Sequence, residues 1–339
     1  MNVYFANSPE SLPADALAGF AEAHRDLVSH NAEHGYLRAL RPSGSRRVGL
    51  VSGGGSGHEP LHIGFVGAGM LDAACPGRIF TSPHNRQIFE ASRAVAGPDG
   101  VLHIVKNYTG DRINFGIAAE RLAHENIRCA RVLIDDDVAS DSDGVAAGRR
   151  GTGATLLVEK LLGAAADEGR GLDELVEFGA DLVARARSIA VASAAHTAPG
   201  TGLPAFTLPE RTLEYGVGIH GERAKDSRQQ EPVEQLVGEM TQTLLSALEL
   251  SSGSSVIGLV NGLGSVTQLE LYAVFRELSR ALHRHGVTLA RHLVGSFVAA
   301  LDMRGFSLTL LAADDQTLAL WDAPALTPAW HRNAATAGG

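Results

Sequence analysis

The sequence predicts an α/β protein made of two α/β domains, each with a mostly parallel or mixed sheet covered by helices. The first observation is that short apolar runs of strand length alternate with amphipathic helical patterns, as when residues 101–106 are followed by 112–124. The second is that polar residues follow several of these apolar runs, at the point where a strand would end. Such a series is typical of a largely parallel sheet with helices on both faces.

The chain length favours two domains, which we place at residues 1–188 and 189–330, followed by a flexible tail at 331–339. Apolar runs indicate strands, and apolar residues spaced three and four apart indicate helices. In the first domain these patterns predict a helix within 15–30, a strand at 48–51, a helix starting at Pro60, a strand and turn at 78–83, a helix at 85–95, a strand at 101–106, a helix at 112–124, a strand at 131–134 and helices at 154–166 and 172–188. In the second they predict a strand from 189, a Pro/Gly-rich connection at 197–209, helices at 231–250 and 267–285, and strands at 255–260, 287–291 and 306–311.

Composition excludes several classes of protein. The 339 residues are 45% hydrophobic and 20% charged, which suits a folded core, and the formal net charge of -9 argues against a nucleic-acid partner. With two cysteines, Cys75 and Cys129, no disulfide framework is expected, in keeping with a reducing cytoplasm. The N-terminal residues lack signal-peptide features, and no apolar run approaches the ~20 residues that cross a bilayer. We therefore expect a cytoplasmic protein with no membrane partner.

A glycine-rich segment, residues 51–59, follows the strand predicted at 48–51. Four of the five residues from 53 to 57 are glycine, so a ligand can approach the main-chain N–H groups closely. Known glycine-rich templates do not fit: a phosphate-binding Walker loop needs Gly-Lys-Ser/Thr, the dinucleotide fingerprint needs glycine where His58 stands, and the hydrolase elbow also breaks at His58. The segment indicates a ligand cradle, or a tight turn without a ligand.

His58-Glu59-Pro60-Leu61-His62 also fits the H-E-x-x-H pattern of zinc proteases. That pattern binds zinc only when both histidines lie on one face of a continuous helix. Pro60 disfavours helical geometry in the residue before it, so the helix is predicted to start at Pro60 with His58 in the loop. A zinc protease is therefore a remote alternative, and we expect no metal site.

Three polar residues follow strands or stand among glycines: His58, Asp111 and His220. Lys106 ends the strand predicted at 101–106. Because a parallel sheet gathers its strand ends at one edge, His58, Lys106 and Asp111 are expected to share one cleft, whereas His220 reaches it only through the fold. Each residue also has a plain structural interpretation, as a helix cap for Asp111, a solvated lysine, or a structural or exposed histidine.

Seven segments, in order over roughly residues 1–325, resemble the ketone-binding subunit of dihydroxyacetone kinases. They are 49–60, 106–116, 135–138, 148–151, 216–222, 260–264 and 307–310. The resemblance implies that His220 attaches covalently to the ketone carbonyl as a hemiaminal, which selects ketones over polyols. It implies that Asp111 takes the proton of the terminal hydroxyl and that His58 serves the carbinol oxygen. Gly55, Ser56, Gly57, His58, Lys106 and Asp111 are the implied substrate-binding residues.

The resemblance also implies a partner, because the sequence contains neither a Walker loop nor a protein-kinase signature. We expect no cofactor in this chain, no second module after it, and a phosphoryl group donated by a small helical subunit that holds ATP or ADP with Mg²⁺. That subunit uses ATP directly or is re-phosphorylated by a phosphocarrier protein, and the family also forms homodimers.

Three stretches depart from the family pattern: Arg223-Ala224, where Pro-Gly is usual, His84-Asn85-Arg86, and residues 193–202. These departures bear on substrate and partner identity more than on reaction type. Two alternatives stay open: a kinase subunit for another short ketose such as erythrulose, and a non-catalytic ketose-sensing co-regulator of the same fold.

Overall fold

The computed structural model describes residues 4–141, 148–224 and 226–333, and these form two compact units. Of the described residues, unit 1 comprises 4–5, 135–141, 148–154, 183–224 and 226–318, and unit 2 comprises 6–134, 155–182 and 319–333. This division differs from the predicted boundary at 188–189, because 135–154 return to unit 1. Asp136 explains the return: its main-chain oxygen accepts from the Ser188 N–H at 2.8 Å, and its carboxylate accepts from Thr152.

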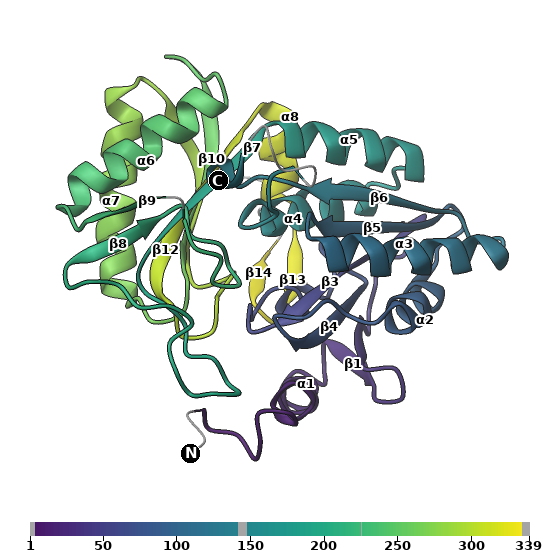
Figure 1. The fold of residues 1–339 in the computed structure, drawn as a ribbon. Helices are drawn as coiled ribbons and strands as arrows, with labels where there is room; N and C mark the ends of the chain where they lie inside the picture. The colour runs from purple at the N-terminus through teal and green to yellow at the C-terminus, as the bar shows by residue number, and fades with distance from the viewer. Residues whose placement is uncertain (1–3, 142–147, 225, 334–339) are drawn as a thin grey trace. The chain divides into compact units, whose positions relative to one another are not determined.

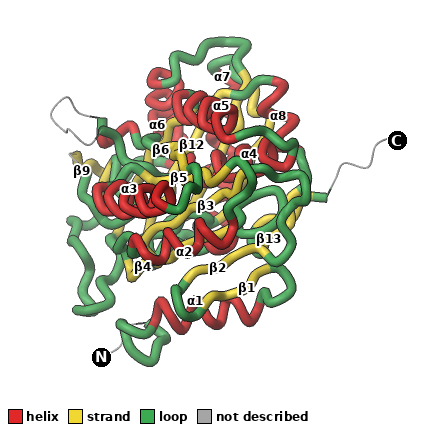
Figure 2. Tube along the Cα trace, turned by 90° about the vertical axis from the view of Figure 1, so that its right-hand side faces the viewer, coloured by secondary structure: helices red, strands yellow, loops and turns green. Residues whose placement is uncertain are grey.

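Unit 2 is built on a sheet of strand order β1-β2-β4-β3-β5-β6, in which β3, β4, β5 and β6 run parallel and β1 and β2 form an antiparallel edge (Figure 1). The strands are β1 (Val28–Asn31), β2 (Tyr36–Ala39), β3 (Val48–Ser56), β4 (Ala73–Ile79), β5 (Gly100–Lys106) and β6 (Cys129–Ile134). The helices are α1 (Leu12–Ala23), α2 (Asn85–Val95), α3 (Thr109–His124), α4 (Ala154–Asp167) and α5 (Leu172–Ala184), with a short 3-10 turn η1 (Ile63–Phe65). Helix α1 lies along β1 (Figure 2).

The two faces of this sheet carry different helices. Helices α2 and α3 lie side by side on one face (Figure 1), where their apolar residues pack on Val101 and Val105 of β5. Side chains alternate along a strand, so Leu102, Ile104 and Lys106 point to the opposite face. Gly179 of α5 contacts Val132, which pairs with Ile104, so α5 covers that opposite face. Lys106 is thus carried to the end of a fully buried strand.

Unit 1 has a mixed sheet of strand order β11-β10-β12-β7-β8-β9, in which only β10 and β11 of the described strands run parallel. The strands are β7 (Ala186–Ala194), β8 (Thr212–Tyr215), β9 (Asp226–Gln229), β10 (Ser255–Gly262), β11 (Thr288–Gly295) and β12 (Arg304–Ala312). Helices α6 (Val233–Ala247) and α7 (Gln268–Arg284) bury their apolar stripes on this sheet. Helix α7 begins with a capping box between Thr267 and Glu270. The α/β class predicted from the sequence is confirmed.

Four sequence predictions are corrected by the structure. Strand β3 runs on to Ser56, because Gly53 and Gly54 pair with β4, so most of the predicted loop is strand. No α-helix starts at Pro60; a turn leads into η1 instead. Helix α3 begins at Thr109, so Asp111 lies inside its first turn. The predicted tail is ordered as far as β14 (Trp330–Arg332), which pairs with β13 (Ala325–Thr327).

Further elements lie outside the predicted set. They are the four-residue strands β1, β2, β8 and β9, the helix α8 (Asp315–Asp322) and the 3-10 turn η2 (Val138–Ser140). Residues 334–339 of the predicted tail lie outside the described part of the chain. Within the described residues, no helix combines the length and the apolar character needed to span a membrane.

Candidate functional site

The carboxyl end of β3 and the residue after it, residues 53–57, are closely packed, and we call them the cradle. Neighbouring atoms there leave no room for a side chain on Gly53 or Gly55. A Cβ atom on Gly53 would stand 2.5 Å from the Cys75 oxygen, and one on Gly55 would stand 2.6 Å from the Thr81 nitrogen. Ser56 Oγ donates to the Gly77 oxygen at 2.7 Å. Gly57 has a φ of 101°, and its N–H donates to Glu59 Oε2 at 2.7 Å. Close packing against neighbouring main-chain atoms therefore requires glycine at Gly53 and Gly55.

Lys106 and Asp111 form a buried ion pair at the end of the next strand. Lys106 Nζ lies 3.9 Å from Asp111 Oδ2, with the two side chains 0% and 4% exposed. Asp111 is in the first turn of α3, where the helix dipole favours a negative charge. Its other oxygen, Oδ1, is buried and has no hydrogen-bond partner among the described residues. This oxygen is placed to accept a proton or a hydroxyl hydrogen from a ligand.

His58 follows the cradle and is buried, with its ring stacked on Phe80 at a centroid distance of 5.0 Å. It lies near enough to His62 to contribute to lowering the pKa of that ring. His58, Lys106 and Asp111 thus all belong to unit 2, at adjacent parallel strands. The strand-end prediction is in keeping with this placement.

Two residues behind Lys106 were missed as site residues. Lys106 Nζ contacts His62 Nε2 at 2.8 Å, and His62 Nδ1 contacts Glu159 Oε1 of α4 at 2.6 Å and Ser52 Oγ at 2.9 Å. Burial, with Lys106 and His58 adding to it, lowers the pKa of His62 well below its ordinary value. Burial raises the pKa of Glu159 to about 8, although Ser52 and Lys106 oppose it. The sequence points to His62 only as part of the zinc pattern.

The same contacts argue against zinc at this segment. Both ring nitrogens of His62 are engaged, one of them by a lysine, and a neighbouring cation opposes a metal ion. Among the described residues, no group of three or more His, Cys, Asp or Glu side chains is arranged to hold a metal.

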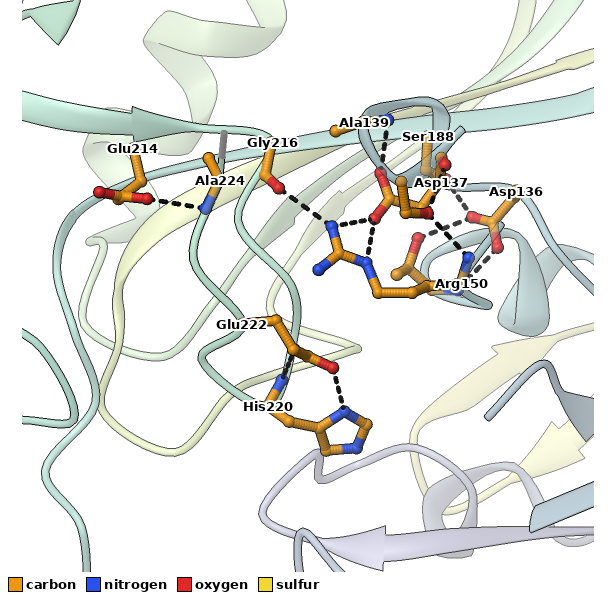
Figure 3. Close-up of polar contacts among 12 residues, drawn as sticks. Asp136, Asp137, Ala139, Arg150, Ser188, Glu214, Gly216, His220, Glu222 and Ala224 are labelled. Atoms are coloured by element: carbon orange, nitrogen blue, oxygen red, sulfur yellow. Dashed lines mark hydrogen bonds and ion pairs between the residues drawn. The ribbon is translucent and has the colours of Figure 1, made fainter. Parts of the chain in front are cut away.

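His220 belongs to unit 1 and stands on a glycine-rich loop between Gly216 and Glu222 (Figure 3). Its main-chain N–H donates to Glu222 Oε2 at 3.0 Å, and its ring Nδ1 lies 3.2 Å from Glu222 Oε1. Although burial opposes it, hydrogen bonding and charge from His220 help lower the pKa of Glu222 to about 2. An ionised Glu222 favours the His220 tautomer that carries its proton on Nδ1.

Charged residues hold both ends of this loop through hydrogen bonds (Figure 3). Arg150 donates to the Gly216 oxygen at 3.0 Å and to Asp137 Oδ2 at 2.8 Å. Beyond the loop, the buried Glu214 accepts from Arg223 at 2.6 Å and from the Ala224 N–H at 2.7 Å. Arg223-Ala224, which departs from the family pattern, is therefore part of the anchor. Burial raises the pKa of Asp137 to about 6 against the effect of Arg150.

The fold and these groups define an α/β protein that presents a small polar cradle, a buried cation–carboxylate pair and a histidine on a glycine loop. Residues 18–329 match the Dak1 domain. The chain belongs to this family, that of the dihydroxyacetone kinases, which are phosphotransferases.

Individual relatives cover almost the whole chain. It is 45% identical over 347 residues to the dihydroxyacetone-binding subunit DhaK of the PEP-dependent dihydroxyacetone kinase of Escherichia coli K12, covering 95% of this chain and 97% of that protein. The structure of the C. freundii dihydroxyacetone kinase superposes with a TM-score of 0.87 at 31% identity, over 98% of this chain and 61% of that one. The dihydroxyacetone kinase operon co-activator Dha-DhaQ superposes with a TM-score of 0.89 at 32% identity, over 94% and 98%.

Proposed function

We propose that this chain is the substrate-binding, catalytic subunit of a dihydroxyacetone kinase. The observation that carries the proposal is the buried Asp111 carboxylate, paired with Lys106 at 3.9 Å and keeping Oδ1 without a partner among the described residues. A buried carboxylate of this kind suits a general base. The similarity to DhaK of E. coli along nearly the full length of both chains supports the choice of substrate.

His220 is the proposed nucleophile toward the ketone. With the Nδ1 proton held by Glu222, the Nε2 lone pair attacks the carbonyl carbon and the π electrons of the C=O bond move to oxygen. The attack gives an imidazolium ring and an alkoxide. The ring then gives up its Nδ1 proton while the alkoxide oxygen takes up one proton, so the neutral hemiaminal forms by addition without net loss of an atom. His58 is the proposed partner of that oxygen, by hydrogen bond or proton transfer.

Asp111 is the proposed base in phosphoryl transfer. As the terminal hydroxyl oxygen forms its bond to phosphorus and the donor's P–O bond breaks, the hydroxyl proton passes to Asp111. The Lys106 ammonium and the main chain of Gly55, Ser56 and Gly57 are proposed to hold the substrate hydroxyls.

The phosphoryl group is proposed to come from a separate small helical subunit carrying ATP, or ADP, with Mg²⁺. The names of two relatives support a partner system: one is the PEP-dependent E. coli subunit, and the other is the PTS-dependent subunit of Listeria innocua, 38% identical over 310 residues. We further propose a homodimer in the cytoplasm. The free thiols of Cys75 and Cys129 are compatible with that compartment.

A second candidate is a ketose-sensing co-regulator that binds its ligand without transferring phosphate. It is favoured by the structural similarity to the co-activator Dha-DhaQ. A kinase subunit for another short ketose is the third, and erythrulose is the substrate to include in a panel.

One assay separates these functions. The purified chain is mixed with dihydroxyacetone or erythrulose, with ATP-using or PEP-dependent partner subunits, and phosphorylated product is measured. Product from dihydroxyacetone with one class of partner is expected. Product from erythrulose alone would reassign the substrate, and ligand binding without product with every partner would favour the co-regulator.

A further inference from the structure

Behind the Lys106–Asp111 pair lie two buried groups that the proposed reaction does not use, the His62 ring and the Glu159 carboxylate. Lys106 Nζ, the His62 ring and the Glu159 carboxylate form a row joined by contacts of 2.8 and 2.6 Å. The three side chains are 0%, 4% and 0% exposed. Burying such a row of groups costs free energy unless each proton in it is held in a hydrogen bond.

The ring tautomer couples the two contacts. When Lys106 is an ammonium it donates to His62 Nε2, so the ring proton sits on Nδ1 and is donated to the Glu159 carboxylate. If Lys106 gives its proton to Nε2, Nδ1 gives its own to Glu159, and both ends of the row become neutral. No proton is gained or lost in this exchange. The charge on Lys106 therefore depends on the ability of Glu159 to hold a proton.

Groups on α3, α4 and β3 surround Lys106, and their effects support this coupling. Asp111 of α3 and Glu159 of α4 raise the pKa of the lysine, while burial lowers it. From β3, the Gly53 oxygen lies 3.4 Å from Nζ, and a Cβ on Gly54 would overlap Nζ. A charge on His58 lowers the pKa of His62. The second oxygen of Glu159 is buried without a hydrogen-bond partner among the described residues, while the carboxylate interacts with His62 and with the Ser52 hydroxyl.

We propose that His62 and Glu159 are positioning residues that form a buried proton relay, which sets the charge and the aim of the Lys106 ammonium beside Asp111. Its role in turnover rests on the proposed function, but the relay itself is a property of the free protein. It is therefore tested without substrate.

The sequence makes the test unusually direct, since Lys106, Lys160 and Lys225 are its three lysines. Protein labelled with ¹³C at lysine Cε gives three signals, which Lys160→Arg and Lys225→Arg assign, and the titration midpoint of Lys106 is followed by NMR. In Glu159→Gln the midpoint is expected to fall by about one pH unit, because an opposite charge near the ammonium is lost. Glu159→Asp is expected to recover part of the shift. Lys160→Arg, one residue along α4, is the matched control and leaves the midpoint unchanged.

A folded Glu159→Gln protein with the Lys106 midpoint of the parent would overturn the relay. If Glu159→Gln does not fold, His62→Asn takes its place: the midpoint again falls if the relay exists and is unchanged if it does not. In active protein, the pH at which phosphoryl transfer reaches half its maximum is expected to move in the same direction as the NMR midpoint. Loss of activity in the parent would count against the proposed function alone, because the titration contains no substrate.

Discussion

The surroundings of Lys106 in unit 2 and the His220 loop in unit 1 are built in opposite ways. In unit 2, Lys106, Asp111, His62 and Glu159 lie in a dry interior and hold one another at contacts of 2.6 to 3.9 Å. In unit 1, the His220 side chain is 19% exposed and rides on a loop with three glycines among residues 216–222. A proton acceptor gains from fixed neighbours and low dielectric, whereas a nucleophile that repeatedly forms and breaks a bond needs access. Under the proposed function, unit 2 carries the proposed acid–base residues and unit 1 carries the proposed nucleophile.

The largest expected effect comes from removing the base in unit 2. Asp111→Asn keeps the shape of the side chain but cannot accept the hydroxyl proton, so turnover is expected to fall at least ~100-fold while the ligand adduct still forms. Glu120→Gln, an exposed carboxylate on the same helix, is the control and should be neutral. Steady-state kinetics and mass spectrometry check both. Near-parental turnover in Asp111→Asn would remove Asp111 from the mechanism.

A smaller effect is expected from crowding the cradle. Gly54→Ala places a methyl group on the position of Lys106 Nζ, so the lysine must move and ligand affinity is expected to fall about tenfold, or ~1.4 kcal/mol. Gly116→Ala on α3 has no atom within 4 Å of its added methyl group. It is expected to leave binding alone and to stabilise the helix by up to ~1 kcal/mol. Calorimetric binding with both variants decides the point; equal affinities would show that Lys106 does not hold the ligand.

The loop of unit 1 offers the matching substitution. Gly221 has a φ of 84°, and a methyl group there would lie 2.6 Å from the His196 ring, so Gly221→Ala is expected to distort the His220 loop. Adduct formation should slow several-fold, with little change in unfolding temperature. Gly200→Ala, which meets nothing within 4 Å, is the control. An unchanged rate of adduct formation in Gly221→Ala would contradict a role for this glycine in shaping the His220 loop.

The smallest expected effect on function comes from His103, which changes the stability of the fold at low pH. His103 is buried in unit 2, 2.8 Å from Ser92 Oγ, and burial lowers its pKa to about 3. Above pH 6.5 the ring is neutral in both folded and unfolded chains. Between pH 6.5 and 3 only the unfolded chain binds the proton, so stability falls with decreasing pH by up to ~1.4 kcal/mol per unit.

Urea unfolding of His103→Gln from pH 7 to pH 4 is expected to show a weaker pH dependence than the parent. His283→Gln on the exposed surface of α7 in unit 1 is the control and should follow the parent curve. Parallel curves for His103→Gln and the parent would contradict a neutral buried ring.

The sequence predicted helices and strands well where the apolar spacing of the element is clear. Helix α2 was predicted and observed at 85–95, and the β5 prediction at 101–106 misses one residue. The glycines of β3 were predicted as loop because glycine has a low strand propensity; pairing with β4 overrides that preference. The strands β1, β2, β8 and β9 have four residues each, too few for a periodic signal.

The site shows the same limit. His58, Lys106 and Asp111 follow from the rule that parallel strand ends gather at one edge. Glu159 does not, because it stands 97 residues from His62 and its burial depends on how α4 packs on the sheet. A signal was present: Glu159-Lys160 is the one charged pair in the apolar helix predicted at 154–166. Both residues are 0% exposed, with Lys160 donating to the Leu320 oxygen at 2.8 Å.

The most direct measurement of the covalent claim is native mass spectrometry of the parent, His220→Ala and Asp111→Asn proteins with dihydroxyacetone. We predict a mass increase of one intact dihydroxyacetone per chain in the parent and in Asp111→Asn, and none in His220→Ala. An adduct that persists in His220→Ala, or a parent that forms none, would contradict capture of the ketone by His220.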